Sequence, residues 1–337
     1  MENFEHLMIS KEISATIADL IHRSNEQYIP SAKLKAPNSI PIRVGIAGGL
    51  PNNSITSDIV SGCLSVKQAC YGTCFAAKAF WGQGIDFGIR VENTINNSLI
   101  EKDLEKLPAT QRYLRNGWNS DPSWNWEKAL ELTKIINKKK ILTIFISKAF
   151  HRIKKDTLDS LVANNAEMRI SLSALDNNTQ LKNRLKFIID YRNAGGVAIP
   201  VIMSSCYNNK ELNERQEHMV NWVLDNDLPA AENSLRFPLN APITSLVDLK
   251  QTRHIYQSND VWSGRLFADR LLFPTTTSMP DDYRGLPAAY ASKIDKRILA
   301  PLFVDPVKTH EEVMNDLTGF VPPLKSGVPE IRPDLQQ

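Results

Sequence analysis

Three of the four cysteines in the chain lie within twelve residues, at Cys63, Cys70 and Cys74. The first gap holds six residues and the second holds three, and a loop of this size can bring three thiolates to one point. Gly62 and Gly72 supply the backbone freedom that such a tight loop requires. The first residues show no secretory signal, so we do not expect a disulfide framework. The trio therefore predicts metal binding or redox chemistry.

Three interpretations of the cysteine trio stay open on spacing alone. Three thiolates without a nearby fourth ligand suit a 4Fe–4S cluster in which one iron is left open for a substrate or cofactor. A structural zinc site wants four ligands, and the fourth would be Cys206 or a histidine that the fold returns to the trio. The third interpretation is that these are ordinary buried cysteines.

Composition and charge narrow the class of protein. The chain has 337 residues, of which 42% are hydrophobic and 23% are charged, as in ordinary globular proteins. A net charge of +3 is too close to balance to indicate a polyanionic partner by itself. The longest apolar run, 141–146, is far shorter than the ~20 residues of a membrane-spanning helix. We therefore expect a cytoplasmic protein that has no membrane partner.

The chain between residues 41 and 250 is predicted to alternate between strands and helices. Residues 141–147 form a strand that is apolar on both faces, which is typical of a parallel sheet covered by helices. Repeated strand–helix–strand units also favour a parallel sheet. The expected helices span 10–29, 127–140, 156–164, 179–193 and 209–225, and the expected strands span 43–47, 87–91, 141–147, 168–173, 197–203 and 235–239.

The strand at 168–173 indicates how this sheet is curved. Its alternation places Arg169, Ser171 and Ser173 on one face and apolar residues on the other. A polar face suits the inside of a barrel, so we expect an α/β fold with a partial, open parallel β/α barrel rather than a flat sheet. Chemistry in such folds collects at the C-terminal ends of the strands. The residues predicted at those ends are Ser147, Lys148, Ser173, Ser204, Ser205 and Cys206.

The cysteine loop and the elements after it resemble the radical S-adenosylmethionine (SAM) superfamily, most closely its spore-photoproduct-lyase-like branch. The trio followed by Phe75 is similar to that family's cluster loop, although the family's usual spacing is the shorter Cys-x3-Cys-x2-Cys. Segments 89–93, 143–158, 169–176 and 184–202 resemble later family elements in the same order, so the resemblance covers roughly residues 60–205. It implies an N-terminal helical extension at 1–40, a partial barrel at 41–250, and a C-terminal cap with an irregular tail at 251–337.

The resemblance implies an enzyme whose activity depends on two cofactors, a 4Fe–4S cluster and SAM. Cys63, Cys70 and Cys74 would hold three irons, and the fourth iron would bind the amino and carboxylate groups of SAM. One electron would then cleave SAM, and the resulting 5′-deoxyadenosyl radical would abstract hydrogen from a substrate. The expected partners are SAM and an electron donor such as a flavodoxin or ferredoxin. The substrate class stays open among nucleic acids, peptides and small metabolites.

The same resemblance assigns expected contacts to residues outside the trio. Lys148 would pair with the SAM carboxylate, and Ser147 would contact the methionine amino group or its backbone. Ser171 and Ser173 would hydrogen-bond the carboxylate or the ribose of SAM. These positions are also compatible with ordinary inner-face or surface residues.

Several further residues are candidates around the predicted cluster. Tyr71 and Phe75 would shield it from water, or they belong to the core. Cys206 is a candidate catalytic thiol or hydrogen donor, or a small buried residue. Tryptophans 118, 124 and 126 would form a lid over the barrel mouth or stack on a substrate ring. The alternative function is a non-catalytic nucleic-acid-binding protein stabilised by zinc or by a cluster.

Overall fold

The computed structural model describes residues 4–63, 70, 74–109, 111, 113–255, 259–264, 266–267 and 270–271. Its helices are α1 (Lys11–Tyr28), α3 (Phe75–Gly82), α4 (Asn97–Glu105), α5 (Trp126–Asn137), α6 (Lys155–Ala163), α7 (Asn178–Asn193) and α8 (Lys210–Asp225). Its strands are β1 (Val60–Ser61), β2 (Val91–Glu92), β3 (Tyr113–Asn116), β4 (Leu142–Ser147), β5 (Glu167–Ser173), β6 (Val197–Ser204), β7 (Ala231–Ser234), β8 (Arg236–Pro238), β9 (Arg253–Ile255) and β10 (Asp260–Trp262). Short 3-10 helices lie at Glu5–Leu7, Ile46–Gly48, Pro122–Asn125, Pro242–Leu246 and Leu249–Gln251.

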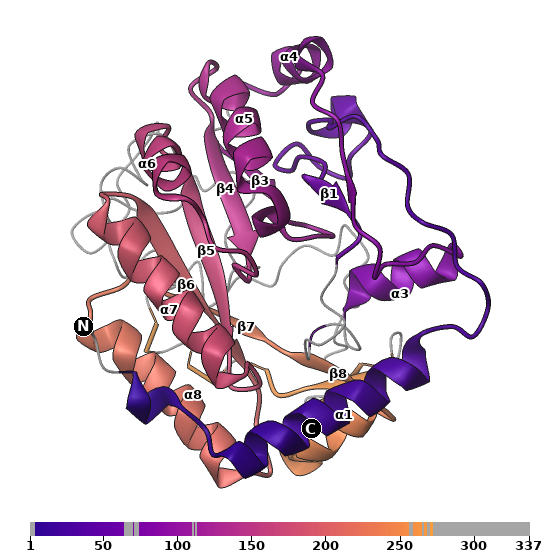
Figure 1. Ribbon diagram of the computed structural model, residues 1–337, viewed down its shortest axis with the longest axis vertical. Helices are drawn as coiled ribbons and strands as arrows, with labels where there is room; N and C mark the ends of the chain where they lie inside the picture. Colours follow the sequence, from indigo (N-terminus) through magenta and orange to yellow (C-terminus); the bar gives the residue numbers. More distant parts are fainter. Residues whose placement is uncertain are drawn as a thin grey trace.

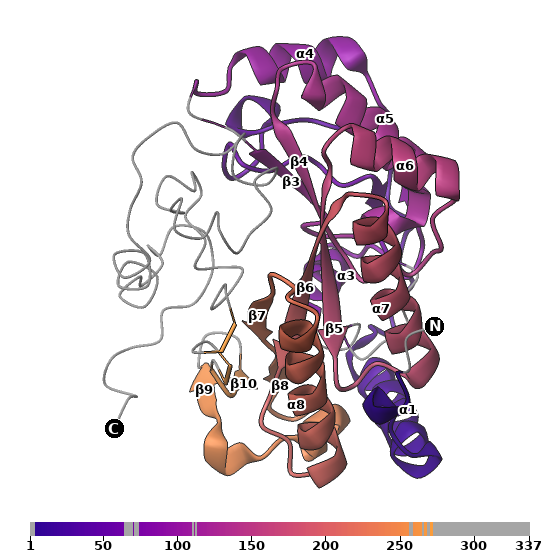
Figure 2. The same cartoon turned by 90° about the vertical axis from the view of Figure 1, so that its left-hand side faces the viewer.

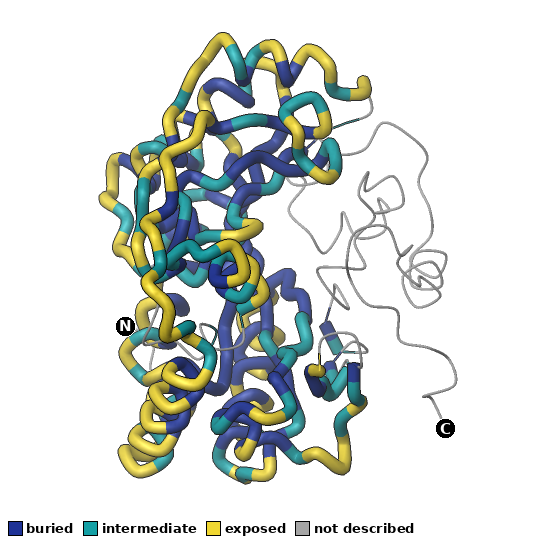
Figure 3. Tube along the Cα trace, turned by 90° about the vertical axis from the view of Figure 1, so that its right-hand side faces the viewer, coloured by how far each residue is buried: buried dark blue, intermediate teal, exposed yellow. Residues whose placement is uncertain are grey.

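The centre of the fold is a five-stranded sheet in the order β3-β4-β5-β6-β7. All neighbouring strands in it are parallel. The sheet curls into a half-barrel, and α5, α6, α7 and α8 cover its outer face (Figure 1). Buried positions concentrate in the strands and on the inward sides of the helices (Figure 3). The expected α/β fold with an open parallel barrel is therefore confirmed at this level.

Asparagine side chains begin four of the helices. Each accepts a hydrogen bond from a backbone N–H in the first turn, which that turn cannot satisfy internally. At α7 the cap is reciprocal, because the Gln180 side chain also accepts from the backbone N–H of Asn177. The four caps are Asn96, Asn125, Asn177 and Asn209. The predicted starts of α5, α7 and α8 lie within a residue or two of the observed ones, whereas α4 was not predicted.

The alternation predicted for β5 is confirmed. Its apolar residues belong to the core that the helices cover, whereas Arg169, Ser171 and Ser173 occupy the opposite positions of the strand. All seven residues of the strand are buried. Arg169 is compensated by Glu167, at 2.7 Å between Nε and Oε1, and both side chains are at most 2% exposed. The inner face of the half-barrel is therefore polar along this strand.

Two of the expected strands are wrong. Residues 43–47 form only an isolated bridge at Val44 and then a 3-10 turn, because Gly45 has a φ of +59° that no regular strand accommodates. Residues 87–90 form a turn in which the Asp86 carboxylate accepts the Gly88 N–H at 2.8 Å. The strand begins at Val91 and pairs with β1 in an antiparallel arrangement.

The sheet contains two strands that the hydrophobic pattern did not predict. β3 and β7 form its edges, and β7 has the polar sequence Ala-Glu-Asn-Ser. The strand expected at 235–239 exists as β8, but it belongs to a separate antiparallel sheet in the order β8-β10-β9 (Figure 2). β7 can carry the fully buried Glu232 because the carboxylate accepts hydrogen bonds from the Ser204 hydroxyl and from the backbone N–H of Phe267.

The N-terminal helix packs on the same core as the half-barrel. Ile17, Leu20 and Ile21 of α1 belong to that core, and the Ser24 hydroxyl accepts the backbone N–H of Ile243 at 2.8 Å. Most of the expected cap at 251–337 lies outside the described residues. In the described part of the chain, no helix combines the length and the apolar character needed to cross a membrane.

Candidate functional site

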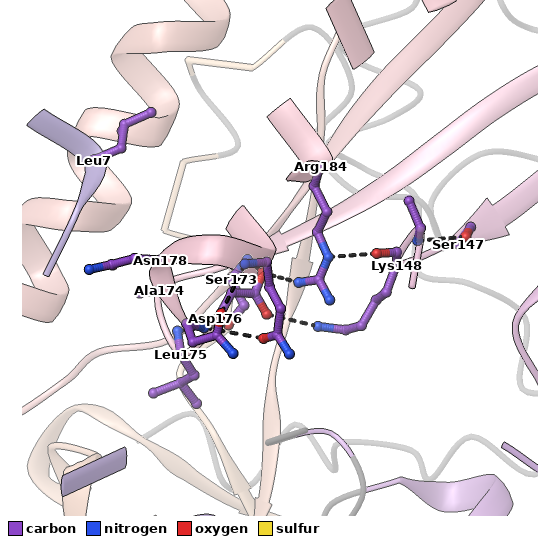
Figure 4. A network of polar contacts seen from close by, with 12 residues as sticks. Leu7, Ser147, Lys148, Ser173, Ala174, Leu175, Asp176, Asn178 and Arg184 are labelled. Carbon is purple, nitrogen blue, oxygen red and sulfur yellow. Dashed lines mark hydrogen bonds and ion pairs between the residues drawn. The ribbon is translucent and has the colours of Figure 1, made fainter. Parts of the chain in front are cut away.

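Polar residues meet where β4 and β5 end, at the edge of the sheet predicted to carry the chemistry. Ser147 is the last residue of β4, Lys148 follows it, and Ser173 ends β5. The turn after β5 brings Asp176 to the same place, and Arg184 reaches it from α7 (Figure 4). Parallel strands necessarily align their C-terminal ends, so residues far apart in the sequence become neighbours here.

Asp176 is the centre of this group. Its carboxylate is 3% exposed, forms an ion pair with Arg184 and lies 3.4 Å from the Lys148 ammonium. It also accepts the backbone N–H of Ser173 at 2.9 Å. Burial alone would raise the pKa of Asp176, but the charges of Arg184 and Lys148 outweigh it and hold the pKa at about 2. Two cations therefore share one ionised carboxylate at the strand ends.

The turn after β4 is held by a second carboxylate, Asp121. The Ser147 hydroxyl donates to one oxygen of Asp121 at 2.7 Å, and the Lys148 N–H donates to the other at 2.6 Å. The Ser147 oxygen also accepts the N–H of Ala149 at 2.8 Å, and the Lys148 carbonyl accepts from Arg184 Nε at 2.6 Å. The Ser147 hydroxyl and the Lys148 N–H and carbonyl therefore all have hydrogen-bond partners within the protein. The Lys148 ammonium extends towards Asp176.

The loop that carries this carboxylate has its own support. Gly117 has a φ of +97°, and a Cβ at this position would lie 2.1 Å from the carbonyl oxygen of Ile146. The Asp58 carboxylate accepts the N–H groups of Gly117 and Trp118 at 3.2 and 2.8 Å, and that of Asn119 at 3.0 Å. Burial raises the pKa of Asp58 to about 7, although these backbone donors oppose the rise.

Cys63 lies against the turn that precedes β2. Its N–H donates to the carbonyl of Phe87 at 2.7 Å, and its sulfur accepts the indole N–H of Trp124 at 3.2 Å. Gly62 allows this close approach: its φ is +79°, and a Cβ would lie 2.0 Å from the Ile89 oxygen. The backbone freedom expected of Gly62 is thus used in the structure.

Cys70 and Cys74 lie near each other, and Cys70 is also close enough to Lys148 and Arg184 to feel their charges. Cys74 packs in the same apolar cluster as Cys63. Burial raises the pKa of Cys74 to about 11, and the neighbouring Cys70 adds to the rise. Burial also raises the pKa of Cys70, but the charges of Lys148 and Arg184 oppose this rise. The Cys70 thiol is therefore within electrostatic reach of those two cations.

The three thiols, all of them described, do not form a complete set of metal ligands in the structure. Among the residues that the structure describes, no group of three or more His, Cys, Asp or Glu side chains is arranged to hold a metal ion. Residues 64–69 and 71–73 lie outside the described part of the chain, and with them Tyr71 and Gly72. The donors themselves suit iron or zinc, since both metals bind thiolates.

A chain of ring contacts joins Cys63 to the ionic group. Trp124 stacks on Phe150 with ring centroids 5.1 Å apart, and the Arg184 guanidinium lies 5.7 Å from the same Phe150 ring. Trp126 is buried and stacks on Phe187 instead. The three tryptophans therefore do not form a single lid, as one interpretation of their loop expected.

The remaining predicted residues have different surroundings. Phe75 is 61% exposed and meets Trp118 edge-on, so it belongs to the surface rather than to the apolar cluster around the thiols. Ser171 lies on the inner face and is 9% exposed. Cys206 follows β6, and its N–H donates to the Ser263 hydroxyl at 2.8 Å. Burial raises the pKa of Cys206, although that hydroxyl opposes the rise.

Two residues of this site, Asp121 and Tyr207, carried no clear signal in the sequence. Asp176 lies in the turn just after β5, which ends at Ser173, and this is a usable signal, whereas Asp121 lies in a loop of mixed composition. Tyr207 is 3% exposed, and its phenol faces Ser173. Burial raises the pKa of this phenol well above its ordinary value.

The comparisons with known proteins add no family to this description. No family model matches the chain, and a search of curated proteins finds no match.

Proposed function

We propose that this chain is a radical SAM enzyme whose 4Fe–4S cluster is held by Cys63, Cys70 and Cys74. The observation that carries the proposal is the position of Cys70, whose thiol is within electrostatic reach of Lys148 and Arg184. Lys148 follows the C-terminal end of β4 in a parallel half-barrel, the edge where such folds place their chemistry, and this supports the proposal. The ordered resemblance over residues 60–205 supports the same proposal.

A cluster held by Cys63, Cys70 and Cys74 would supply the one-electron reduction needed for cleavage of SAM, and hydrogen abstraction from the substrate would follow from that chemistry. The Lys148 ammonium binds the carboxylate of SAM as a compact charge. Lys148 pairs with Asp176 in the structure, and Arg184 pairs with the same carboxylate. Arg184 would therefore keep Asp176 compensated when the lysine turns to the carboxylate of SAM. Ser171 binds the ribose or carboxylate from the inner face of β5.

Other residues position these groups or exclude water. Ser147 acts through Asp121, since its hydroxyl donates to that carboxylate, and it holds the turn that presents Lys148. Ser173 does the same for the turn after β5, where its hydroxyl accepts the N–H of Leu175 at 3.2 Å. An apolar cluster around two of the thiols limits access of water, which tunes a metal centre and protects it from oxidation.

Loading the site with metal must release protons. The pKa of Cys74 is raised to about 11 and that of Cys70 is raised as well, so both are thiols near neutral pH before metal binds. Thiolates are the ligands, and metal binding therefore becomes stronger as pH rises.

The partners follow from this chemistry and are part of the proposal. SAM is the cosubstrate, and a one-electron donor protein of the flavodoxin or ferredoxin type supplies the reducing electron. The substrate is a nucleic acid, a peptide or a small metabolite, and Cys206 at the end of β6 is the candidate hydrogen donor. The proposed location is the cytoplasm.

The test is anaerobic reconstitution with iron and sulfide, followed by incubation with SAM and dithionite. We expect bound iron and sulfide and the formation of 5′-deoxyadenosine. Cys70→Ala should lose the product, whereas Cys206→Ala is the thiol-matched control and should keep its iron. Colourless protein that binds one zinc, and loses it in Cys206→Ala, would contradict the proposal and support the zinc-stabilised nucleic-acid-binding alternative.

A further inference from the structure

The indole N–H of Trp124 is aimed at the sulfur of Cys63. The distance from Nε1 to Sγ is 3.2 Å, within the range of a hydrogen bond to sulfur. Cys63 is 6% exposed, so the contact lies inside the protein rather than at its surface. A tryptophan in this loop was expected to cover the barrel mouth or to stack on a substrate, and neither role requires a contact with a cysteine.

The Trp124 ring is held from three sides, which fixes the direction of its N–H. Phe150 stacks on it at 5.1 Å with an angle of 20°, and His151 meets it edge-on at 4.9 Å. Arg90 places its guanidinium carbon 5.3 Å from the ring centroid and donates to the Trp124 carbonyl at 3.3 Å. A cation over the ring draws electron density from the indole, which strengthens its N–H as a donor.

We propose that Trp124 tunes the reduction potential of the metal centre bound by Cys63; this inference rests on the proposed function. Trp124 is a positioning residue, because it acts through the sulfur and not on the substrate. Hydrogen bonds to ligand sulfurs are one of the levers by which proteins set the potentials of iron–sulfur clusters. The bond withdraws charge from the sulfur and is stronger when the centre carries one more electron. It therefore favours the reduced form and raises the potential.

The expected size follows from the strength of such a bond. The electron comes from a one-electron reductant such as dithionite, passes to the metal centre and moves no proton. A bond to a charged acceptor changes such an equilibrium by roughly threefold to tenfold. For a one-electron couple this ratio corresponds to about 30–60 mV.

The first measurement compares midpoint potentials of reconstituted protein by spectroelectrochemistry. Trp124→Phe removes the N–H and keeps an aromatic ring, and its potential should fall by about 30–60 mV. Trp126→Phe is the matched control, since that indole N–H donates to the carbonyl of His151 at 3.0 Å and not to a sulfur. Its potential should equal that of the wild type. Equal potentials in all three proteins would overturn the proposal.

The second measurement needs no metal. The chain has six tryptophans, so ¹⁵N-labelled protein should give six indole N–H signals, and Trp124→Phe identifies one of them. Cys63→Ala should shift the Trp124 signal and speed its hydrogen exchange, while the Trp126 signal stays in place. An unmoved Trp124 signal would show that the N–H does not bond this sulfur, and the proposal would be wrong.

The two measurements separate this proposal from the proposed function. Protein that binds iron but does not cleave SAM, and still shows the fall in potential for Trp124→Phe, would refute the enzyme activity and support the role of Trp124. Protein that cleaves SAM, but whose potential is the same in wild type and in Trp124→Phe, would support the enzyme activity and refute the role of Trp124. Wild-type protein that holds no iron under reconstitution would overturn both.

Discussion

Replacing Asp176 by Asn should destabilise the protein in a way that depends on pH. Arg184 is 1% exposed and forms an ion pair with this carboxylate, so the substitution leaves a buried guanidinium without its counter-charge. Breaking a buried pair by removing one partner costs about 3–5 kcal/mol. The free energy of unfolding at neutral pH should therefore fall by that amount in Asp176→Asn.

The pH dependence follows from the pKa of Asp176. It is lowered from the ordinary 3.8 to about 2, a shift worth about 2 kcal/mol. A carboxyl whose pKa is lowered on folding contributes stability above its unfolded pKa, and this contribution is lost as pH falls through the folded pKa. The difference between wild type and Asp176→Asn should thus be constant from about pH 7 to about pH 5. It should narrow by about 2 kcal/mol on approaching about pH 2.

The assay is urea unfolding followed by tryptophan fluorescence, repeated across this pH range for both proteins. Other carboxyl groups titrate in the same range, but they cancel in the difference between wild type and variant. Asp190→Asn is the control, because Asp190 forms an exposed pair with Lys186 at 2.8 Å on α7, the helix that also carries Arg184. Its loss should cost less than about 1 kcal/mol. A cost for Asp176→Asn that equals the control, or that does not change with pH, would refute the reasoning.

Three further substitutions test the supports of the site. Gly117→Ala should destabilise by more than about 2 kcal/mol in urea unfolding, because its φ is +97° and its Cβ would meet the Ile146 oxygen; a neutral substitution would contradict this backbone geometry. Glu232→Gln weakens the acceptor of the Phe267 N–H, which is now bonded at 2.9 Å, and should lower the free energy of unfolding by about 1–3 kcal/mol. Proteolysis near Phe267 should become faster, and an unchanged cleavage rate would argue against a role for this hydrogen bond in holding Phe267. The pKa of Asp58 is raised to about 7, so wild type should lose stability relative to Asp58→Asn, by up to about 4 kcal/mol, as pH rises from about 4 through 7. A difference that is flat over this range, measured by urea unfolding, would contradict the raised pKa.

Local signals in the sequence were enough to predict most of the sheet and its helices. The strand 141–147 is apolar on both faces because helices cover one side and the barrel interior lies on the other. The alternation of β5 and the asparagine before α7 act over a few residues, and short-range patterns of this kind survive in the fold. Gly62 was also identified correctly, since its backbone lies so close to the Ile89 carbonyl that any side chain is excluded there.

The strand errors have a common physical cause. β3 and β7 are edge strands whose pairing depends on neighbours far away in the sequence, and β7 carries a glutamate that only its tertiary partners make tolerable in a buried position. Conversely, residues 43–47 are apolar enough for a strand, but glycine geometry at 45 turns the chain away.

The sequence alone identifies the types of the candidate site residues, whereas their contacts depend on the tertiary structure. The cysteine trio could be selected from its type and spacing, and Ser147, Lys148 and Ser173 from their places at strand ends. That Asp176 is shared by two cations, or that Trp124 donates to Cys63, could not be predicted. The contacts of Asp176 with Lys148 and of Trp124 with Cys63 join residues 28 and 61 positions apart, and their geometry exists only after the parallel strands have aligned their ends.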